Sequence, residues 1–77
     1  MPTTLQQLKP GDRAKVIGYA EAEGVYARQL LSLGLIPGTV LAVERVAPLG
    51  DPVEIGFRGM HLALRPGEAE GLALEKL

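Results

Sequence analysis

Residues 30–38 read LLSLGLIPG, and this stretch sets the fold of the chain. Five of its nine residues are large and aliphatic, and it closes on Pro-Gly. A chain of 77 residues buries only about 60% of the surface that its unfolded form exposes, so its core is thin. The stretch therefore either supplies much of that core or forms an apolar surface for a partner.

The apolar residues in and before this stretch have the period of a helix. Ala27, Leu30 and Leu31 are spaced i, i+3 and i+4, which predicts an amphipathic helix over about residues 25–33 with its apolar face toward the core. Gly34 stands where a left-handed residue ends a helix. We therefore expect Leu30 to fill the core and the helix to cover one open end of a small barrel.

Short aliphatic and β-branched runs fill most of the remaining sequence, and turn-forming Pro, Gly and Asp residues separate them. These runs predict five strands, over residues 12–20, 39–47, 53–58, 60–65 and 72–77. Short helical turns are expected near residues 4–8 and 66–70. Five short strands are most stable as a closed barrel, because an open sheet leaves its edges exposed. The chain is expected to form one unit over residues 1–77.

Three positions predict local irregularity in these strands. Gly18 follows a break in the alternation of the first strand, which indicates a bulge. Gly56 falls on the outward face of the third strand, where it either lets another backbone approach or marks strong coiling. Arg58 and Gly59 fit a tight hairpin, since glycine tolerates a positive φ.

The composition argues against nucleic acid as a partner. Eight basic and nine acidic side chains give a formal net charge of −1, and the chain has only two tyrosines and one phenylalanine. A nucleic-acid binder normally carries a basic surplus and exposed rings on which bases stack. The chain has no cysteine, no signal-peptide pattern at its start and no apolar run near the roughly 20 residues that span a bilayer. We expect a cytoplasmic protein that does not insert into a membrane.

No set of residues predicts catalysis or a firm metal site. Ser32, His61 and Asp51 could be drawn as a triad, but nothing in the sequence brings them together, and a triad is defined by its geometry. Two acidic pairs, Glu21 with Glu23 and Glu68 with Glu70, could hold a hard cation loosely. Solvated loop acids are the favoured interpretation of both pairs. We expect no enzyme, no cofactor and no resident metal.

Apolar residues in the loops favour a binding module instead. Leu49 lies in the turn APLGDP, and Leu35 and Ile36 lie in GLIPG. Single exposed aliphatic residues are ordinary, but several together on one surface mark a docking site.

Four segments make the chain similar to the FeoA family of small ferrous-iron-transport proteins. They are LKPGDRAKVIGY (8–19), LLSLGLIPGT (30–39), RVAPLGDPVEI (45–55) and LALR with the acidic stretch that follows it (62–70). The resemblance covers nearly the whole chain. It implies an SH3-like β-barrel with one inserted helix, which agrees with the strands expected above.

The resemblance also implies a partner, the membrane iron permease FeoB, which FeoA proteins contact from the cytosolic side. The candidates for that contact in this chain are Arg28, Leu35, Leu49 and Asp51. Family members often carry a basic residue directly before the leucine pair, where this chain has Gln29. Its basic residue is one position earlier, which moves the charge by about 100° around a helix.

Two other functions remain open at this point. A similar barrel forms the C-terminal part of iron-dependent repressors, so the chain could be a regulatory module of a transcription regulator or could sense metal. An RNA-binding barrel is a third hypothesis, and it predicts that a polyanion column retains the protein in a salt-dependent way. Self-association through the helix or a barrel edge is also left open.

Overall fold

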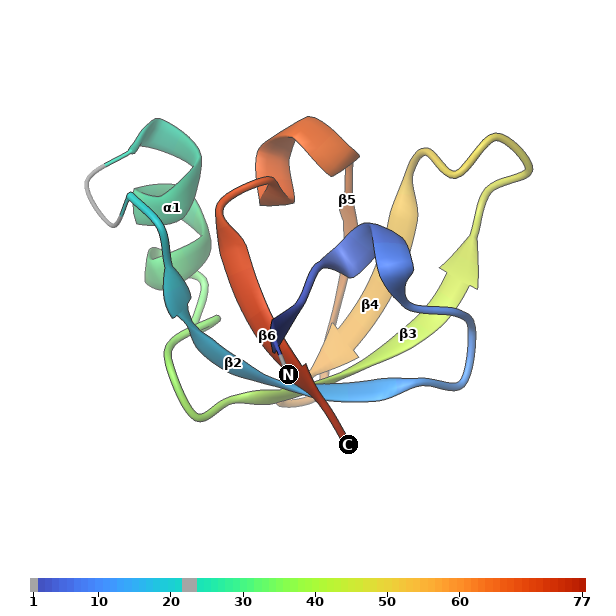
Figure 1. Ribbon diagram of the computed structural model, residues 1–77, viewed down its shortest axis with the longest axis horizontal. Helices are drawn as coiled ribbons and strands as arrows, with labels where there is room; N and C mark the ends of the chain where they lie inside the picture. Colours follow the sequence, from blue (N-terminus) through green and yellow to red (C-terminus); the bar gives the residue numbers. More distant parts are fainter. Residues whose placement is uncertain (1, 22–23) are drawn as a thin grey trace.

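A computed structural model describes residues 2–21 and 24–77 and shows a six-stranded antiparallel sheet that curls around one core (Figure 1). The strand order is β1-β6-β2-β3-β4-β5. The strands are β1 (Pro2–Thr3), β2 (Arg13–Tyr19), β3 (Val40–Val46), β4 (Val53–Phe57), β5 (Met60–Leu64) and β6 (Leu72–Lys76). The helical elements are α1 (Val25–Ser32) and the two 3-10 turns η1 (Leu5–Gln7) and η2 (Pro66–Ala69).

The mainly β fold with one inserted helix is confirmed, but the predicted number of five strands is wrong. The additional strand is β1, in which Pro2 pairs with Glu75 and Thr3 with Leu74 of β6. Two residues show no alternation of apolar and polar side chains, so the sequence gives no sign of this strand. It forms because the free edge of β6 offers backbone groups to pair with.

The predicted closure of the ring by strand pairing is also absent between the described strands. β1 and β5 are the two ends of the strand order and do not pair with each other. Turns and the helix fill this side instead, since η1 contacts η2 and η2 contacts α1.

Two irregularities in register help the sheet to curl. The pairing of β2 with β6 shifts between Val16 and Gly18, which confirms the bulge predicted there. The pairing of β3 with β4 shifts between Val43 and Arg45. An extra residue on one strand bends it and increases its twist. The hairpin at Arg58 and Gly59 is confirmed as well, since both residues have a positive φ.

The core lies between the sheet and the helical elements and is almost entirely aliphatic. Its largest fully buried side chains are Leu5, Leu35, Leu41, Ile55, Leu72, Leu74, Val16, Val43 and Val53. Leu30 is buried in the same cluster, as expected from its position on the apolar face of α1. Leu5 of η1 joins the core too, so the turn before β2 contributes to packing.

The connection from α1 to β3 is fixed by a set of hydrogen bonds. Gly34 has a φ of 105°, which confirms the predicted left-handed end of the helix. The Leu35 N–H donates to the Leu30 carbonyl at 3.1 Å, and the Thr39 hydroxyl donates to the Gly34 carbonyl at 3.2 Å. The Leu35 side chain is 0% exposed. Both halves of the LLSLGLIPG stretch therefore supply core residues.

Gly56 makes room for a side chain and not for a second backbone. Glu44 lies over Gly56, and a Cβ added to this glycine would stand 2.7 Å from Glu44 Oε2. The other carboxylate oxygen of Glu44 lies 2.8 Å from His61 Nδ1 on β5. The Glu44 carboxylate on β3 thus crosses β4 and contacts His61 on β5, because Gly56 has no side chain that would block it.

We predict that Leu30→Ala lowers the free energy of unfolding by about 2–5 kcal/mol, because it leaves a cavity beneath α1. Val25→Ala on the same helix serves as the control, since Val25 is 79% exposed. The control should change stability by less than about 0.5 kcal/mol. Urea unfolding of both variants measures the difference, and equal effects would contradict the assignment of the buried face.

We predict that Gly56→Ala displaces the Glu44 carboxylate and breaks its contact with His61. Stability should change little, by less than about 1 kcal/mol, because Glu44 is a flexible surface side chain and alanine is favoured over glycine in a strand. The measurement is the NMR chemical shifts of the His61 ring, which should move toward those of Glu44→Ala. Unchanged His61 shifts in Gly56→Ala would show that the glycine is not needed for this contact.

Candidate protein-contact site

The three residues that could be drawn as a catalytic triad lie apart, and each has its own structural partner. The Ser32 hydroxyl donates to the Gln29 carbonyl at 2.7 Å at the end of α1. His61 contacts Glu44, and Asp51 pairs with Arg65 at 3.5 Å. No nucleophile and base face each other in this arrangement, so it offers no triad chemistry.

The acidic pairs do not form a metal centre in the part of the chain that the structure describes. No group of three or more His, Asp or Glu side chains there is arranged to hold a metal ion. Glu23, half of one predicted pair, lies outside the described residues. Glu68 already stabilises a turn, because its Oε1 accepts a hydrogen bond from the Arg65 N–H at 3.0 Å.

The four predicted contact residues do not form one patch. Arg28 is exposed on α1, whereas Leu49 and Asp51 are exposed in the β3–β4 loop at the opposite end of the molecule (Figure 1). Leu49 is 96% exposed, the largest value among the large hydrophobic side chains described. Leu35 is not available for contact, because the hydrogen bonds that turn the chain after α1 direct its side chain into the core.

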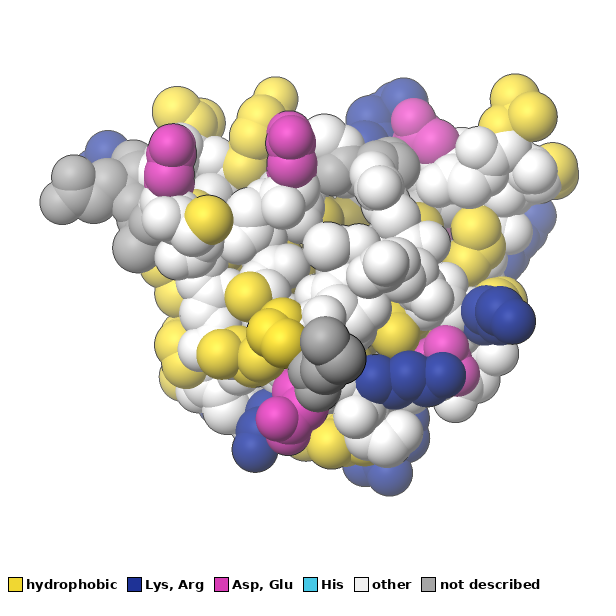
Figure 2. Space-filling view, viewed as in Figure 1, with side chains coloured by type: hydrophobic (Ala, Val, Ile, Leu, Met, Phe, Trp, Pro, Cys, Tyr) yellow, Lys and Arg dark blue, Asp and Glu magenta, His cyan; other side chains and the backbone are white. Residues whose placement is uncertain are grey.

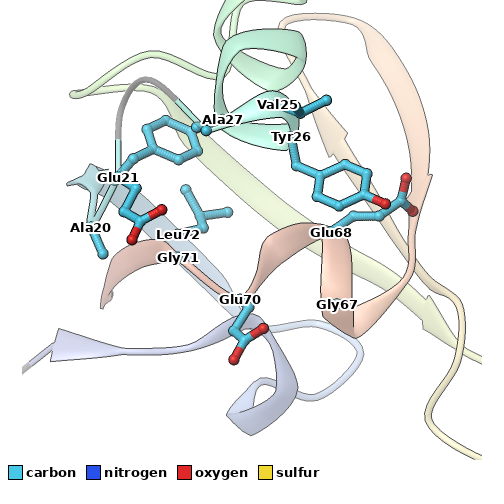
Figure 3. Close-up of a pocket in the computed structure, with 12 residues that line it drawn as sticks. Ala20, Glu21, Val25, Tyr26, Ala27, Gly67, Glu68, Glu70, Gly71 and Leu72 are labelled. Carbon is cyan, nitrogen blue, oxygen red and sulfur yellow. The ribbon is translucent and has the colours of Figure 1, made fainter.

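A hollow that sequence reasoning did not predict lies between α1 and η2, and we call it the α1–η2 cleft (Figure 3). Its volume is about 500 Å³. The end of β2, the first turn of α1, η2 and the start of β6 line it. The lining residues in the described chain are Tyr19, Ala20, Glu21, Gly24, Val25, Tyr26, Ala27, Gly67, Glu68, Glu70, Gly71 and Leu72.

Apolar and acidic groups share this cleft. Figure 3 shows Leu72 between Glu21 on one side and Tyr26 with Glu68 on the other, with Glu70 below them in this view. Figure 2 shows acidic side chains over both the β2–α1 and the η2 sides of this region, with hydrophobic side chains between them. No arginine or lysine lines the hollow among the described residues.

A second, narrower hollow of about 200 Å³ lies between α1 and β5. Leu30, Leu33 and Leu62 line it, together with Tyr26 and Glu68, which also line the α1–η2 cleft. Tyr26 and Glu68 therefore stand at the boundary between the two hollows, which lie next to each other along α1.

Tyr19 ties the back of the cleft to the turn after α1. Its hydroxyl donates to the Leu35 carbonyl at 2.7 Å. Burial raises the pKa of the Tyr19 phenol to about 12, because the phenolate would lose solvation. The phenol therefore stays protonated and keeps this hydrogen bond over the whole physiological pH range.

Comparison with known proteins identifies a family that matches almost the full chain. Residues 3–76 match the family model of the FeoA domain. The chain is 34% identical over 71 residues to the Fe(2+) transport protein A/Fe(2+) transporter FeoB fusion protein of Porphyromonas gingivalis. That alignment covers 92% of this chain but only 8% of the fusion protein.

Solved structures agree with this match. The FeoA protein from Chlorobium tepidum is 47% identical, with a TM-score of 0.83, and the superposition covers 97% of this chain and 70% of that one. The Stenotrophomonas maltophilia FeoA complexed with zinc, an SH3 domain protein, is 26% identical with a TM-score of 0.81 over 95% of this chain and 89% of that one. The predicted SH3-like fold is confirmed. In the described chain, no helix has the length and apolar character needed to cross a bilayer.

We predict that Tyr19→Phe lowers the free energy of unfolding by about 1 kcal/mol at pH 7, because the Leu35 carbonyl loses its donor. The raised pKa sets the pH dependence. The contribution of the Tyr19 phenol to stability is complete below pH 10, the pKa of this phenol in the unfolded chain. It is lost as the pH rises through about 12.

The advantage of the parent chain over Tyr19→Phe should therefore shrink between pH 10 and pH 12 in denaturant unfolding. Tyr26→Phe is the control, since Tyr26 is half-exposed, and it should change stability by less than about 0.5 kcal/mol. A difference between the parent and Tyr19→Phe that stays constant up to pH 12 would contradict the assigned role of the phenol.

Proposed function

Because this chain belongs to the FeoA family of ferrous iron transport proteins, we propose that it is a cytoplasmic accessory protein that docks on a FeoB-type iron permease and modulates uptake. One observation carries the proposal. A relative 34% identical to this chain occurs in one polypeptide with a FeoB transporter. Fusion keeps two proteins at a high effective concentration, which favours pairs that act together.

The surface of the chain suits protein contact better than chemistry. Ser32, His61 and Asp51 are separated, and a catalytic site requires such groups to converge. The β3–β4 loop instead carries Leu49, almost fully exposed. Burying one leucine at an interface contributes about 1.5–3 kcal/mol.

Arg28, Leu49 and Asp51 remain the proposed contact residues. Arg28 lies on α1 and the other two in the β3–β4 loop, so a partner that touches both would have to extend across much of the 31 Å length of the molecule. A standard protein interface, with about 800 Å² buried on each partner, covers a patch of that span. Leu35 is excluded from this set by its burial.

We predict that the chain binds the soluble part of the permease and that Leu49→Ala weakens binding about tenfold or more, because the interface loses one buried aliphatic side chain. Leu77→Ala is a matched control, since Leu77 is also exposed but lies at the C-terminal end of β6, away from the β3–β4 loop. The dissociation constant of Leu77→Ala should stay within about twofold of the parent value. Isothermal titration calorimetry measures both, and iron uptake by cells that carry each variant provides the functional readout.

The outcomes distinguish the docking itself from the assignment of Leu49 to the contact. If the parent chain does not bind the permease, the proposed docking is wrong. If the parent and Leu49→Ala bind equally well, docking stands and Leu49 is removed from the contact.

A further inference from the structure

We propose that the α1–η2 cleft and the narrower hollow beside it together bind an extended segment of the partner that carries a basic side chain next to an aliphatic one. The proposal rests on the proposed docking to the permease and names the part of the partner that would be held. It concerns the helix end of the molecule, away from the β3–β4 loop.

The shape of the surface is the first argument. The two hollows, of about 500 and 200 Å³, lie side by side along α1 with Tyr26 and Glu68 between them, and we refer to the pair as the groove. Its floor is apolar, with the buried Leu72 at the wide end and Leu30 near the narrow end. Grooves lined in part by aromatic rings can hold an extended segment of a partner.

Charge decides which segment fits. Glu21, Glu68 and Glu70 line the wide end, and no ion pair joins any of the three to a described basic residue. No arginine or lysine lines either hollow in residues 2–21 and 24–77. A basic side chain in the wide end would meet complementary charge, whereas an acidic segment would be repelled.

Tyr26 separates the acidic end from the aliphatic end. Its ring is half-exposed at the boundary between the hollows, and Figure 3 shows it extending from α1 toward Glu68. An aromatic face beside carboxylates attracts a guanidinium or ammonium group through the ring quadrupole. The neighbouring narrow hollow, lined by Leu30, Leu33 and Leu62, accepts an aliphatic side chain. The groove therefore selects a basic residue followed or preceded by an aliphatic one.

A free metal ion is a poorer occupant. Glu21 follows β2, whereas Glu68 and Glu70 belong to η2 and its C-terminal end, and the three carboxylates do not form a set of three ligands about one point in the described chain. Divalent cations require several oxygen ligands at 2.0–2.6 Å. A long, flexible basic side chain needs only one or two carboxylates within reach.

The test compares two double variants of equal charge in calorimetric titrations with the soluble part of the permease. Glu21→Gln with Glu70→Gln removes the charge of the groove, and both residues are exposed, so folding should be kept. Glu54→Gln with Glu75→Gln removes the same charge from strands β4 and β6, outside both hollows. Thermal unfolding of each variant checks that the fold is kept.

We expect the groove variant to raise the dissociation constant about three- to tenfold and the control variant to leave it within about twofold. Added salt should weaken binding by the parent chain more than binding by the groove variant, because the charges that salt screens are absent from the variant. Tyr26→Ala, which keeps all the carboxylates, should also weaken binding.

Three results would overturn the inference. Equal affinities for the groove and control variants would place the contact elsewhere and leave the proposed docking intact. No binding by the parent chain would remove the proposed function and this inference together. Calorimetric binding of Fe²⁺ or Mn²⁺ alone to the parent, lost in the groove variant, would make the groove a cation site.

Discussion

The structure depends on the burial of Leu35 in the turn that follows α1. The side chain enters the core, while its N–H donates to Leu30 and its carbonyl accepts from Tyr19. One residue thus joins the helix, β2 and the entry to β3. An eight-residue helix is too short to be stable alone in water, so these bonds and the packing of Leu30 hold α1 against the sheet. The groove along α1 exists only because the helix is fixed in this way.

Much of the fold follows from local sequence patterns. The helix, the bulge at Gly18 and the hairpin at Arg58 and Gly59 were predictable, because each depends on a period or on a residue with special backbone freedom. β1 was not, because two residues carry no pattern and the strand depends on the edge of β6. The role of Gly56 was also missed, since it depends on Glu44, a residue of another strand.

The candidate site was less predictable than the fold. The exposure of Leu49 and Arg28 could be predicted from sequence, because an aliphatic residue in a turn and a basic residue on a helix are exposed by default. Leu35 was misjudged for the same reason, since a leucine between Gly34 and the Pro37-Gly38 turn resembles a loop residue until its hydrogen bonds are known. The α1–η2 cleft gave no signal, because Glu21 and Glu70 are far apart in the chain and only the tertiary fold brings them to one hollow.

The pairing of β1 with β6 places the beginning and the end of the chain beside each other, and Figure 1 shows both on the side of the molecule away from α1 and η2. Tethers attached at the two ends would therefore leave from neighbouring points on the surface. Such a unit can be joined covalently to a larger protein and still turn its helix-bearing side freely toward it. The linker then only has to be long enough to let the unit reorient, and it needs no contact of its own with the sheet.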